Sequence, residues 1–158
     1  MRDIETIYVD DDILVINKPS GMLSIPDGYK PDMPHLRSLL EPKFGRLWMV
    51  HRLDKESSGV MVLARNAQAH RLLNQQFKDR LVNKIYHALV SPHPEWQSQN
   101  VNFPLAINTG RKHLTRVDFI NGKTAFSIFK VIKSSSRSCL LECDIKTGYR
   151  HQIRAHLY

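Results

Sequence analysis

The segment from His51 to Gly59, with the sequence HRLDKESSG, combines a carboxylate, a guanidinium, an imidazole and two hydroxyl groups with a flexible glycine. Apolar runs at 47–50 and 59–64 predict a β-strand on each side of it. The segment is therefore expected to be a loop held between rigid elements, which is where catalytic residues are often carried. Asp54 is the candidate catalytic carboxylate, although a loop aspartate taken alone is more commonly a turn former or a helix cap.

A second group of polar side chains lies near the end of the chain, in GYRHQIRAH at 148–156. The pattern predicts a helix over 149–157, with Arg150 and Arg154 one turn apart on one face. At the start of a helix, such a pair could bind phosphates together with the free backbone N–H groups. A solvated basic helix is the alternative. The tyrosine, glutamine and two histidines among the arginines favour RNA contact.

The third segment is KIYHALV at 84–90, a predicted strand. Tyr86 would share one strand face with Ala88 and Val90, because alternate residues of a strand point to the same side. Judged by this spacing alone, Tyr86 is a core or edge tyrosine.

Composition describes a globular chain of 158 residues with a net charge of +8 and an isoelectric point near 9.7. This length predicts a single domain spanning 1–158. A positive surplus of this size favours an anionic partner, most commonly a nucleic acid, although a merely basic surface is the alternative. Because no apolar run approaches the roughly 18 residues that span a bilayer, and no signal peptide is recognisable, a cytoplasmic location is expected.

Two features could suggest a metal, and neither is convincing. A zinc site would need Cys139 and Cys143 to join His151 and His156, but the intervening loop is too short for the usual finger. The alternating pattern instead predicts buried thiols on one strand face. The three carboxylates at 10–12 point to alternate sides of a chain and converge poorly on one ion, so a hairpin turn is preferred.

The remaining pattern predicts an α+β fold with a mixed, largely antiparallel sheet and a few flanking helices. Asn121-Gly122 is a strong hairpin signal between two of the strands. Asn66 is expected to cap a helix whose core face holds Ala69, Leu72, Leu73 and Phe77. The expected strands are 4–9, 13–16, 47–50, 59–64, 84–90, 115–120, 124–132 and 138–146, and a further helix is expected at 36–44.

Taken together, the three segments resemble the RluA-like family of RNA pseudouridine synthases. That family carries a His-Arg-Leu-Asp-x-x-Thr-Ser-Gly loop, and HRLDKESSG departs from it only at Ser57, which keeps the hydroxyl. The segment NKPSG at 17–21, the strand KIYHALV and the late GYRHQIRAH also match in type and order. The resemblance therefore extends from about Ile13 to Leu157.

The resemblance implies a pseudouridine synthase catalytic fold and a cofactor-free isomerisation of uridines in structured RNA, either ribosomal or transfer RNA, after base flipping. It implies that Asp54 is the essential carboxylate, as nucleophile or as base at the sugar. Tyr86 would pack against the target base and Arg154 would pair with Asp54. Arg52 would enter the RNA stack when the uridine leaves it. The further residues expected to bind RNA are His51, Lys18, Arg150 and His151.

Two departures from the family pattern bear on function. The arginine of the late motif stands one position later than usual, at Arg150, so the family pattern does not by itself predict a phosphate contact there. The chain also stops at Tyr158, whereas family members continue through a Gly-Asp-containing segment and further strands. The expectation is therefore a truncated catalytic domain, a fragment or a natural short form, without a separate N-terminal RNA-binding domain.

Two alternative functions remain open at this stage. The first is a non-catalytic RNA-binding remnant of such an enzyme. The more distant second is a hydrolase of nucleoside or sugar bonds, in which Glu56 would supply the second carboxylate that such chemistry usually needs. A monomer is expected, but no sequence feature fixes the oligomeric state.

Overall fold

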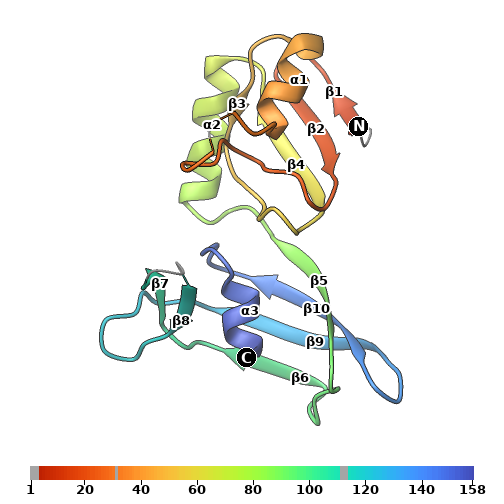
Figure 1. Cartoon of the computed structure of the whole chain (residues 1–158), viewed down its shortest axis with the longest axis vertical. Helices are drawn as coiled ribbons and strands as arrows, with labels where there is room; N and C mark the ends of the chain where they lie inside the picture. The colour runs from red at the N-terminus through yellow and green to blue at the C-terminus, as the bar shows by residue number, and fades with distance from the viewer. Residues whose placement is uncertain (1–3, 31, 111–113) are drawn as a thin grey trace. The chain divides into compact units, whose positions relative to one another are not determined.

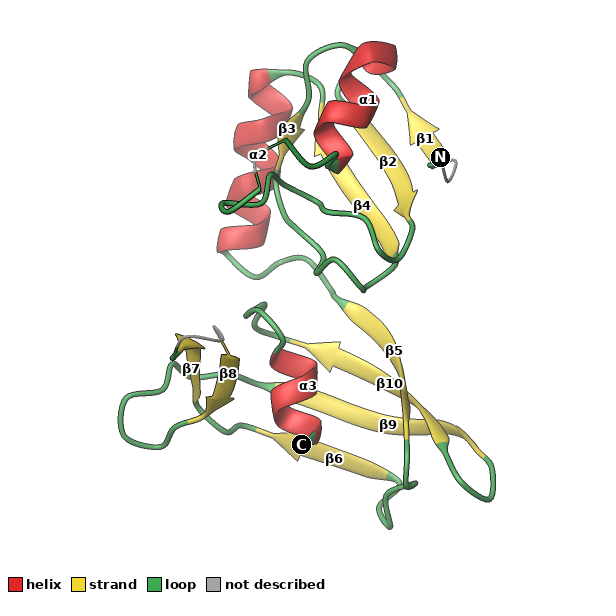
Figure 2. Cartoon of the chain, in the orientation of Figure 1, coloured by secondary structure: helices red, strands yellow, loops and turns green. Residues whose placement is uncertain are grey.

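The computed structural model describes residues 4–30, 32–110 and 114–158. The chain divides into two compact units, Met1–Leu81 and Val82–Tyr158, and each is described by itself (Figure 1). The α+β class expected from the sequence is confirmed, and the pairs formed by the named strands in the described ranges are antiparallel (Figure 2).

The first unit is a four-stranded sheet with two helices. Its strands follow the order β1-β2-β4-β3 across the sheet, and α2 packs beside β3 and β4. The elements are β1 (Glu5–Val9), β2 (Ile13–Lys18), α1 (Leu36–Phe44), β3 (Trp48–Met49), β4 (Gly59–Ala64) and α2 (Ala67–Lys78). The core includes apolar side chains from β2, α1 and β4, among them Leu14, Ile16, Leu36, Met61 and Leu63.

The acidic run at 10–12 forms the turn between β1 and β2, as predicted. The Asp10 carboxylate accepts hydrogen bonds from the backbone N–H groups of Asp12 at 2.9 Å and Ile13 at 2.7 Å. These bonds lower the pKa of Asp10. The run is therefore a structural turn of the kind that aspartate side chains stabilise by bonding their own backbone.

The helix α2 begins where Asn66 was expected to cap it, since the Asn66 side chain accepts the N–H of Ala69 at 2.8 Å. The prediction that Leu72 belongs to the core is wrong, because Leu72 is 55% exposed. The inward face of this helix holds Ala69, Leu73 and Phe77 together with the half-buried polar residues His70 and Asn74, and it leaves Leu72 outside.

The second unit has a four-stranded sheet of order β5-β10-β9-β6, a two-stranded ribbon of β7 and β8, and the short helix α3, which lies on the sheet (Figure 2). Ile153 and Leu157 of α3 pack against a core that includes Phe129 and Cys143. The elements are β5 (Ile85–Val90), β6 (Ser98–Val101), β7 (Leu105–Thr109), β8 (Leu114–Val117), β9 (Ser127–Ser134), β10 (Cys139–Ile145) and α3 (Gln152–Leu157).

The two cysteines are buried thiols on one face of β10, as the alternating pattern predicted. Cys143 is fully buried, and burial, followed by the neighbouring Glu142 charge, raises its pKa to about 11. A thiol with so high a pKa stays protonated near neutral pH and is a poor nucleophile and metal ligand.

The hairpin predicted at Asn121-Gly122 is wrong, because β8 pairs with β7 and not with β9. The Asp118 carboxylate accepts the N–H groups of Ile120 and Asn121, and the Asp118 carbonyl accepts the N–H of Gly122 at 2.9 Å. This turn carries the chain back to pair Lys123 with Leu105. Residues 118–122 therefore form a turn stabilised by Asp118 and not the predicted two-residue hairpin.

Within the described ranges, no helix is long and apolar enough to cross a membrane.

Candidate active site

The loop that carries Asp54 lies beside a second loop because of the strand pairing in the first unit. Lys18, the last residue of β2, pairs with Gly59, the first residue of β4. The segments 19–24 and 51–58 therefore leave the sheet at the same end. Gly59 has a φ of 134°, a backbone conformation that is available essentially only to glycine. This conformation lets the chain turn from the loop into β4.

The backbone of the Asp54 loop is bonded along four consecutive carbonyl groups. The carbonyl of Leu53 accepts the Ser24 hydroxyl at 2.7 Å, and that of Asp54 accepts the N–H of Ser57 at 3.0 Å. The Lys55 carbonyl accepts the N–H of Gly21 at 2.8 Å. The Glu56 carbonyl accepts the hydroxyl of Ser20 at 2.8 Å. The position of the Asp54 backbone is thus fixed by its neighbours on both sides.

Ser24 binds both backbone groups of the residue that precedes Asp54. It is buried, and besides donating to the Leu53 carbonyl it accepts the Leu53 N–H at 3.2 Å. Leu53 is itself buried in the core of the unit. A buried serine must find hydrogen-bonding partners, and here those partners are the peptide groups that set the position of the Asp54 main chain.

Lys18 lies in a buried position, and its direct contact with RNA stays a prediction. The side chain is buried, and its ammonium group donates to the carbonyls of Pro19 at 3.0 Å, Met22 at 2.8 Å and Lys55 at 3.2 Å. An ammonium has three N–H donors, and these three bonds use all of them. Lys18 therefore ties the two loops together.

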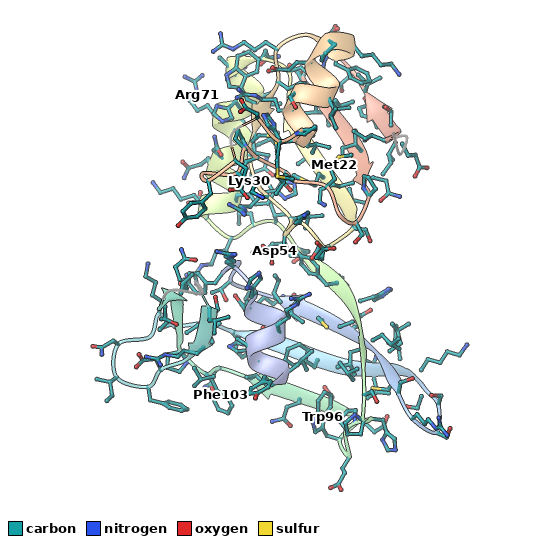
Figure 3. The ribbon with its side chains drawn as sticks, in the orientation of Figure 1. Met22, Lys30, Asp54, Arg71, Trp96 and Phe103 are labelled. Atoms are coloured by element: carbon teal, nitrogen blue, oxygen red, sulfur yellow. The ribbon has the colours of Figure 1, made fainter. Side chains whose placement is uncertain are left out.

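The electrostatic environment of Lys18 couples it to the candidate catalytic carboxylate. Burial lowers the pKa of Lys18, and the negative charges of Glu56 and Asp54 oppose this shift. Asp54 is half-buried on the loop between β3 and β4 (Figure 3), whereas Glu56 is exposed. The site therefore holds one inward-facing cation among carbonyl dipoles, with two carboxylates close enough to attract it.

His51 makes structural contacts in the first unit, and its contact with RNA stays a prediction. Its Nε2 atom accepts the backbone N–H of Val62 at 3.1 Å, and its ring stacks on Phe77 of α2 with the centroids 4.7 Å apart. The imidazole thus joins the start of the loop to β4 and α2. Arg52, the next residue, is exposed, as a residue that contacts RNA must be.

In the second unit, Tyr86 lies on β5 opposite Cys143 of β10. It shares its strand face with Ala88 and Val90, as predicted, and all three are half-buried against the core of the unit. One side of Tyr86 therefore packs against core side chains, which suits a residue that presents a flat surface to a base.

The two late arginines are not on one helix face, which corrects the predicted spacing. The helix α3 begins at Gln152, and Arg150 lies in the turn before it. The guanidinium of Arg150 donates to the Asn108 side chain at 3.1 Å. His151 adopts a left-handed backbone conformation at the helix start, and Arg154 is exposed on α3.

A buried polar network places α3 on its sheet. The amide oxygen of Gln152 accepts the Thr147 hydroxyl at 2.8 Å, and its amide nitrogen donates to the Ser127 hydroxyl at 2.9 Å. His156 contacts Ser127 through Nδ1 at 3.0 Å and the carbonyl of Phe103 through Nε2 at 2.9 Å. Since a carbonyl only accepts, Nε2 must carry the proton, and Nδ1 accepts from Ser127.

This network predicts a loss of stability at mildly acidic pH. Burial lowers the pKa of His156 below its ordinary value of 6.5. As pH falls below that value, the unfolded chain gains a proton that the folded chain resists. The free energy of unfolding should therefore decrease by up to about 1.4 kcal/mol per pH unit until the folded pKa is reached. Above pH 6.5 the stabilisation is fully present.

Chemical denaturation at several pH values would measure this effect, with His156→Gln as the comparison. His35 in the first unit also has a pKa lowered by burial, so the wild type alone cannot identify the residue. The variant should show the weaker pH dependence. Equal slopes in the two proteins would show that His156 is not responsible.

The structure thus groups the predicted site residues in two sets. Lys18, His51, Arg52 and Asp54 lie together in the first unit, and Tyr86, Arg150, His151 and Arg154 lie in the second. The pairing of Asp54 with Arg154 stays a prediction. Sequence reasoning missed the hydrogen-bonding serines Ser20 and Ser24 and the network around Gln152. A serine inside the otherwise apolar stretch MLSIP was the available signal for Ser24.

Comparison with known proteins places this arrangement in a family. The sequence pattern of the RNA pseudouridylate synthase family matches residues 12–158. The chain is 35% identical to the dual-specificity RNA pseudouridine synthase RluA of Vibrio parahaemolyticus, over 97% of this chain and 63% of that protein. It is also 35% identical to the RluA protein of Haemophilus influenzae, over 98% of this chain and 71% of the relative.

Solved structures agree with the sequence comparison. The human RNA pseudouridylate synthase domain containing 4 superposes with a TM-score of 0.78 at 28% identity, covering 97% of this chain and 63% of that one. The human domain containing 1 protein shares the fold, with a TM-score of 0.81 at 24% identity over 98% of this chain and 64% of its own. The chain spans about 63% of the length of the first of the RluA proteins that it matches. From its sequence and its fold, this chain belongs to the RNA pseudouridylate synthase family.

Proposed function

We propose that this chain is an RNA pseudouridine synthase that isomerises uridine in structured RNA through Asp54. The observation that carries the proposal is a half-buried carboxyl group on a loop whose backbone is bonded at four consecutive carbonyls. Catalytic carboxylates need this kind of preorganised support. Membership of the family and the HRLDKESSG sequence of the loop agree with the same reaction.

The reaction consists of bond exchange at the sugar without oxidation or reduction. The N1–C1′ bond breaks, the uracil rotates, and C5 bonds to C1′ and releases its proton. Asp54 would act at the sugar, as a nucleophile or as a base. Tyr86 would pack against the uracil and Arg154 would pair with Asp54. Arg52 would occupy the space that the flipped base leaves in the RNA.

The distribution of charge favours the second unit as the main RNA-binding part. Residues 82–158 contain eleven Lys and Arg against four Asp and Glu, a surplus of seven. Residues 1–81 contain twelve against eleven, a surplus of one. Basic surplus is the electrostatic signature of nucleic-acid binding. The Asp54 loop and the cationic surface therefore lie in different parts of the chain.

RNA affinity should fall with salt, and Arg150→Ala should reduce this dependence. Each lost phosphate contact lowers the slope of log affinity against log salt by about 0.7 to 0.9. Fluorescence anisotropy over a salt series measures the slope. Arg71→Ala is the matched control, because Arg71 is an exposed arginine on α2 of the less charged unit. An unchanged slope for Arg150→Ala would exclude Arg150 from the phosphate contacts.

Tritium release tests the proposed reaction. RNA transcribed with uridine that carries tritium at C5 loses the label to water when C5 bonds to the sugar. The wild-type chain is expected to release tritium from a subset of uridines in ribosomal or transfer RNA. If the chain binds RNA but releases no label, it is the non-catalytic RNA-binding remnant. The relatives are named for both kinds of target, dual-specificity RNA and the ribosomal large subunit.

A single catalytic domain, a cytoplasmic location and a monomeric state were expected from the sequence and stay predictions. Sedimentation of the purified chain would report the oligomeric state directly.

A further inference from the structure

An exposed aromatic surface lies at the turn after β8. Phe119 is 73% exposed, Ile120 is 90% exposed and Phe103 is 44% exposed. The rings of Phe103 and Phe119 meet edge to face with their centroids 5.6 Å apart. These three residues are called the Phe119 platform. Large apolar side chains grouped at the surface commonly mark a site of interaction.

The turn that presents the platform is held by backbone hydrogen bonds. Asp118 donates its N–H to the Pro104 carbonyl at 2.9 Å, and Lys123 and Leu105 exchange two hydrogen bonds of 2.9 Å. A side chain at Gly122 would meet the Asp118 carbonyl at 2.2 Å, so the turn closes too tightly for any residue except glycine. The two aromatic rings are thus carried on a fixed backbone.

The platform is also attached to α3. The Phe103 carbonyl accepts the Nε2 proton of His156, so the buried network that places α3 also fixes the base of the platform. Figure 3 shows Phe103 beside this helix. The exposed Arg154 and the platform therefore belong to one connected part of the second unit.

The charge around the platform favours RNA as the partner. Arg116 and Lys123 flank the turn and are exposed. Asp118 is the acidic residue of the turn, and its carboxylate is bonded to two backbone N–H groups, which lower its pKa. The unit as a whole has a surplus of seven positive charges. Proteins bind single-stranded RNA by combining such a cationic surface with aromatic side chains on which bases stack.

We propose that the Phe119 platform stacks against an unpaired base of the RNA substrate. This inference rests on the proposed function. Phe119 supplies the ring face, Phe103 supports it edge-on, and Arg116 and Lys123 contact the neighbouring phosphates. The contact adds affinity for single-stranded or looped RNA over a continuous duplex, because paired bases do not expose their faces.

The test compares substitutions at Phe119 that separate aromatic stacking from simple apolar contact. The probes are a fluorescein-labelled RNA hairpin with a uridine-containing loop and a fully paired RNA duplex. Phe119→Ala and Phe119→Leu should each weaken hairpin binding about tenfold, and Phe119→Tyr should stay within about twofold of wild type. Duplex binding should not change. Tyr8→Ala is the control, an exposed aromatic residue beside the acidic turn of the first unit.

Three results would overturn the inference. Full retention of affinity in Phe119→Leu would show that the surface only buries apolar area, as it would against a protein partner. Unchanged hairpin affinity in Phe119→Ala would remove the platform from the RNA interface while leaving the proposed function intact. A wild-type chain that binds neither RNA would refute both the platform and the proposed function. Circular dichroism confirms the fold of each variant, which the exposure of Phe119 should preserve.

Discussion

Replacing Asp54 with asparagine is expected to lower pseudouridine formation by several orders of magnitude while RNA affinity stays within a few-fold of wild type. Asparagine is nearly isosteric with aspartate, and the loop is bonded through the backbone of residues 53–56. The loop should therefore survive the change. The substitution removes the negative charge and the nucleophilic oxygen. A group that acts in the transition state affects turnover far more than ground-state binding.

Glu56→Gln is the matched control for Asp54→Asn. Glu56 lies on the same loop, is exposed, and also attracts Lys18. Its amide variant should keep turnover close to wild type. If Glu56→Gln were as inactive as Asp54→Asn, the two carboxylates would act as a pair, as in hydrolases of sugar bonds. A folded Asp54→Asn protein with normal turnover would exclude Asp54 as the catalytic carboxylate.

Replacing Lys18 with methionine is expected to lower the free energy of unfolding by about 2–5 kcal/mol. The methionine side chain has similar length but no donor, so the carbonyls of Pro19 and Met22 lose their bonds to the ammonium. The Lys55 carbonyl keeps the N–H of Gly21. Because the ammonium of Lys18 also loses its bond to the Lys55 carbonyl, which lies on the Asp54 loop, turnover should fall with stability. Urea denaturation measures the change.

Lys55→Met separates this structural role from a general loss of charge. Lys55 is exposed on the Asp54 loop, and its substitution should change stability by less than about 0.5 kcal/mol. The second comparison is the salt dependence of RNA binding by Lys18→Met and by the wild type. If Lys18→Met were as stable as wild type and lost a phosphate contact in the salt series, the original prediction of a direct RNA contact would be correct.

Many elements of the fold could be predicted from the sequence, because at these elements the local sequence pattern agrees with the tertiary structure. The periodicity of 36–44 and the capping role of Asn66 placed the helices of the first unit correctly. Alternation placed Cys139 and Cys143 on the buried face of β10. By contrast, the sequences SQNV and LAINT of β6 and β7 are short and partly polar, and neither shows the apolar alternation that reveals a strand.

Two of the errors occurred where a side chain bonded to backbone in a way that the local pattern does not show. Asn121-Gly122 was predicted to form a two-residue hairpin. Instead the Asp118 carboxylate accepts backbone N–H groups of Ile120 and Asn121, and these bonds form a different turn. Gln152 accepts the N–H of Tyr149 as well as the Thr147 hydroxyl, so the predicted helix starts three residues later than expected. Such bonds to neighbouring backbone compete with regular structure.

The roles of Lys18 and His51 could not be read from the sequence for a related reason. A lysine at the end of a strand is normally exposed. Here carbonyls from two loops converge on it, and the bond to Lys55 joins residues 37 positions apart. The position of the His51 ring is likewise set by contacts with Val62 and Phe77, which lie in other elements. The candidate carboxylate was identifiable from its motif, but the residues that hold its loop required the structure.

Nucleoside analysis of RNA treated with the wild-type chain shows whether this chain isomerises uridine in RNA through Asp54. Digestion followed by chromatography and mass spectrometry separates pseudouridine from uridine, which has the same mass, and from free uracil. Pseudouridine is expected at discrete positions without free uracil, and Asp54→Asn is expected to form neither product. Free uracil would identify a hydrolase, and unmodified RNA after stable binding would contradict catalysis by this chain.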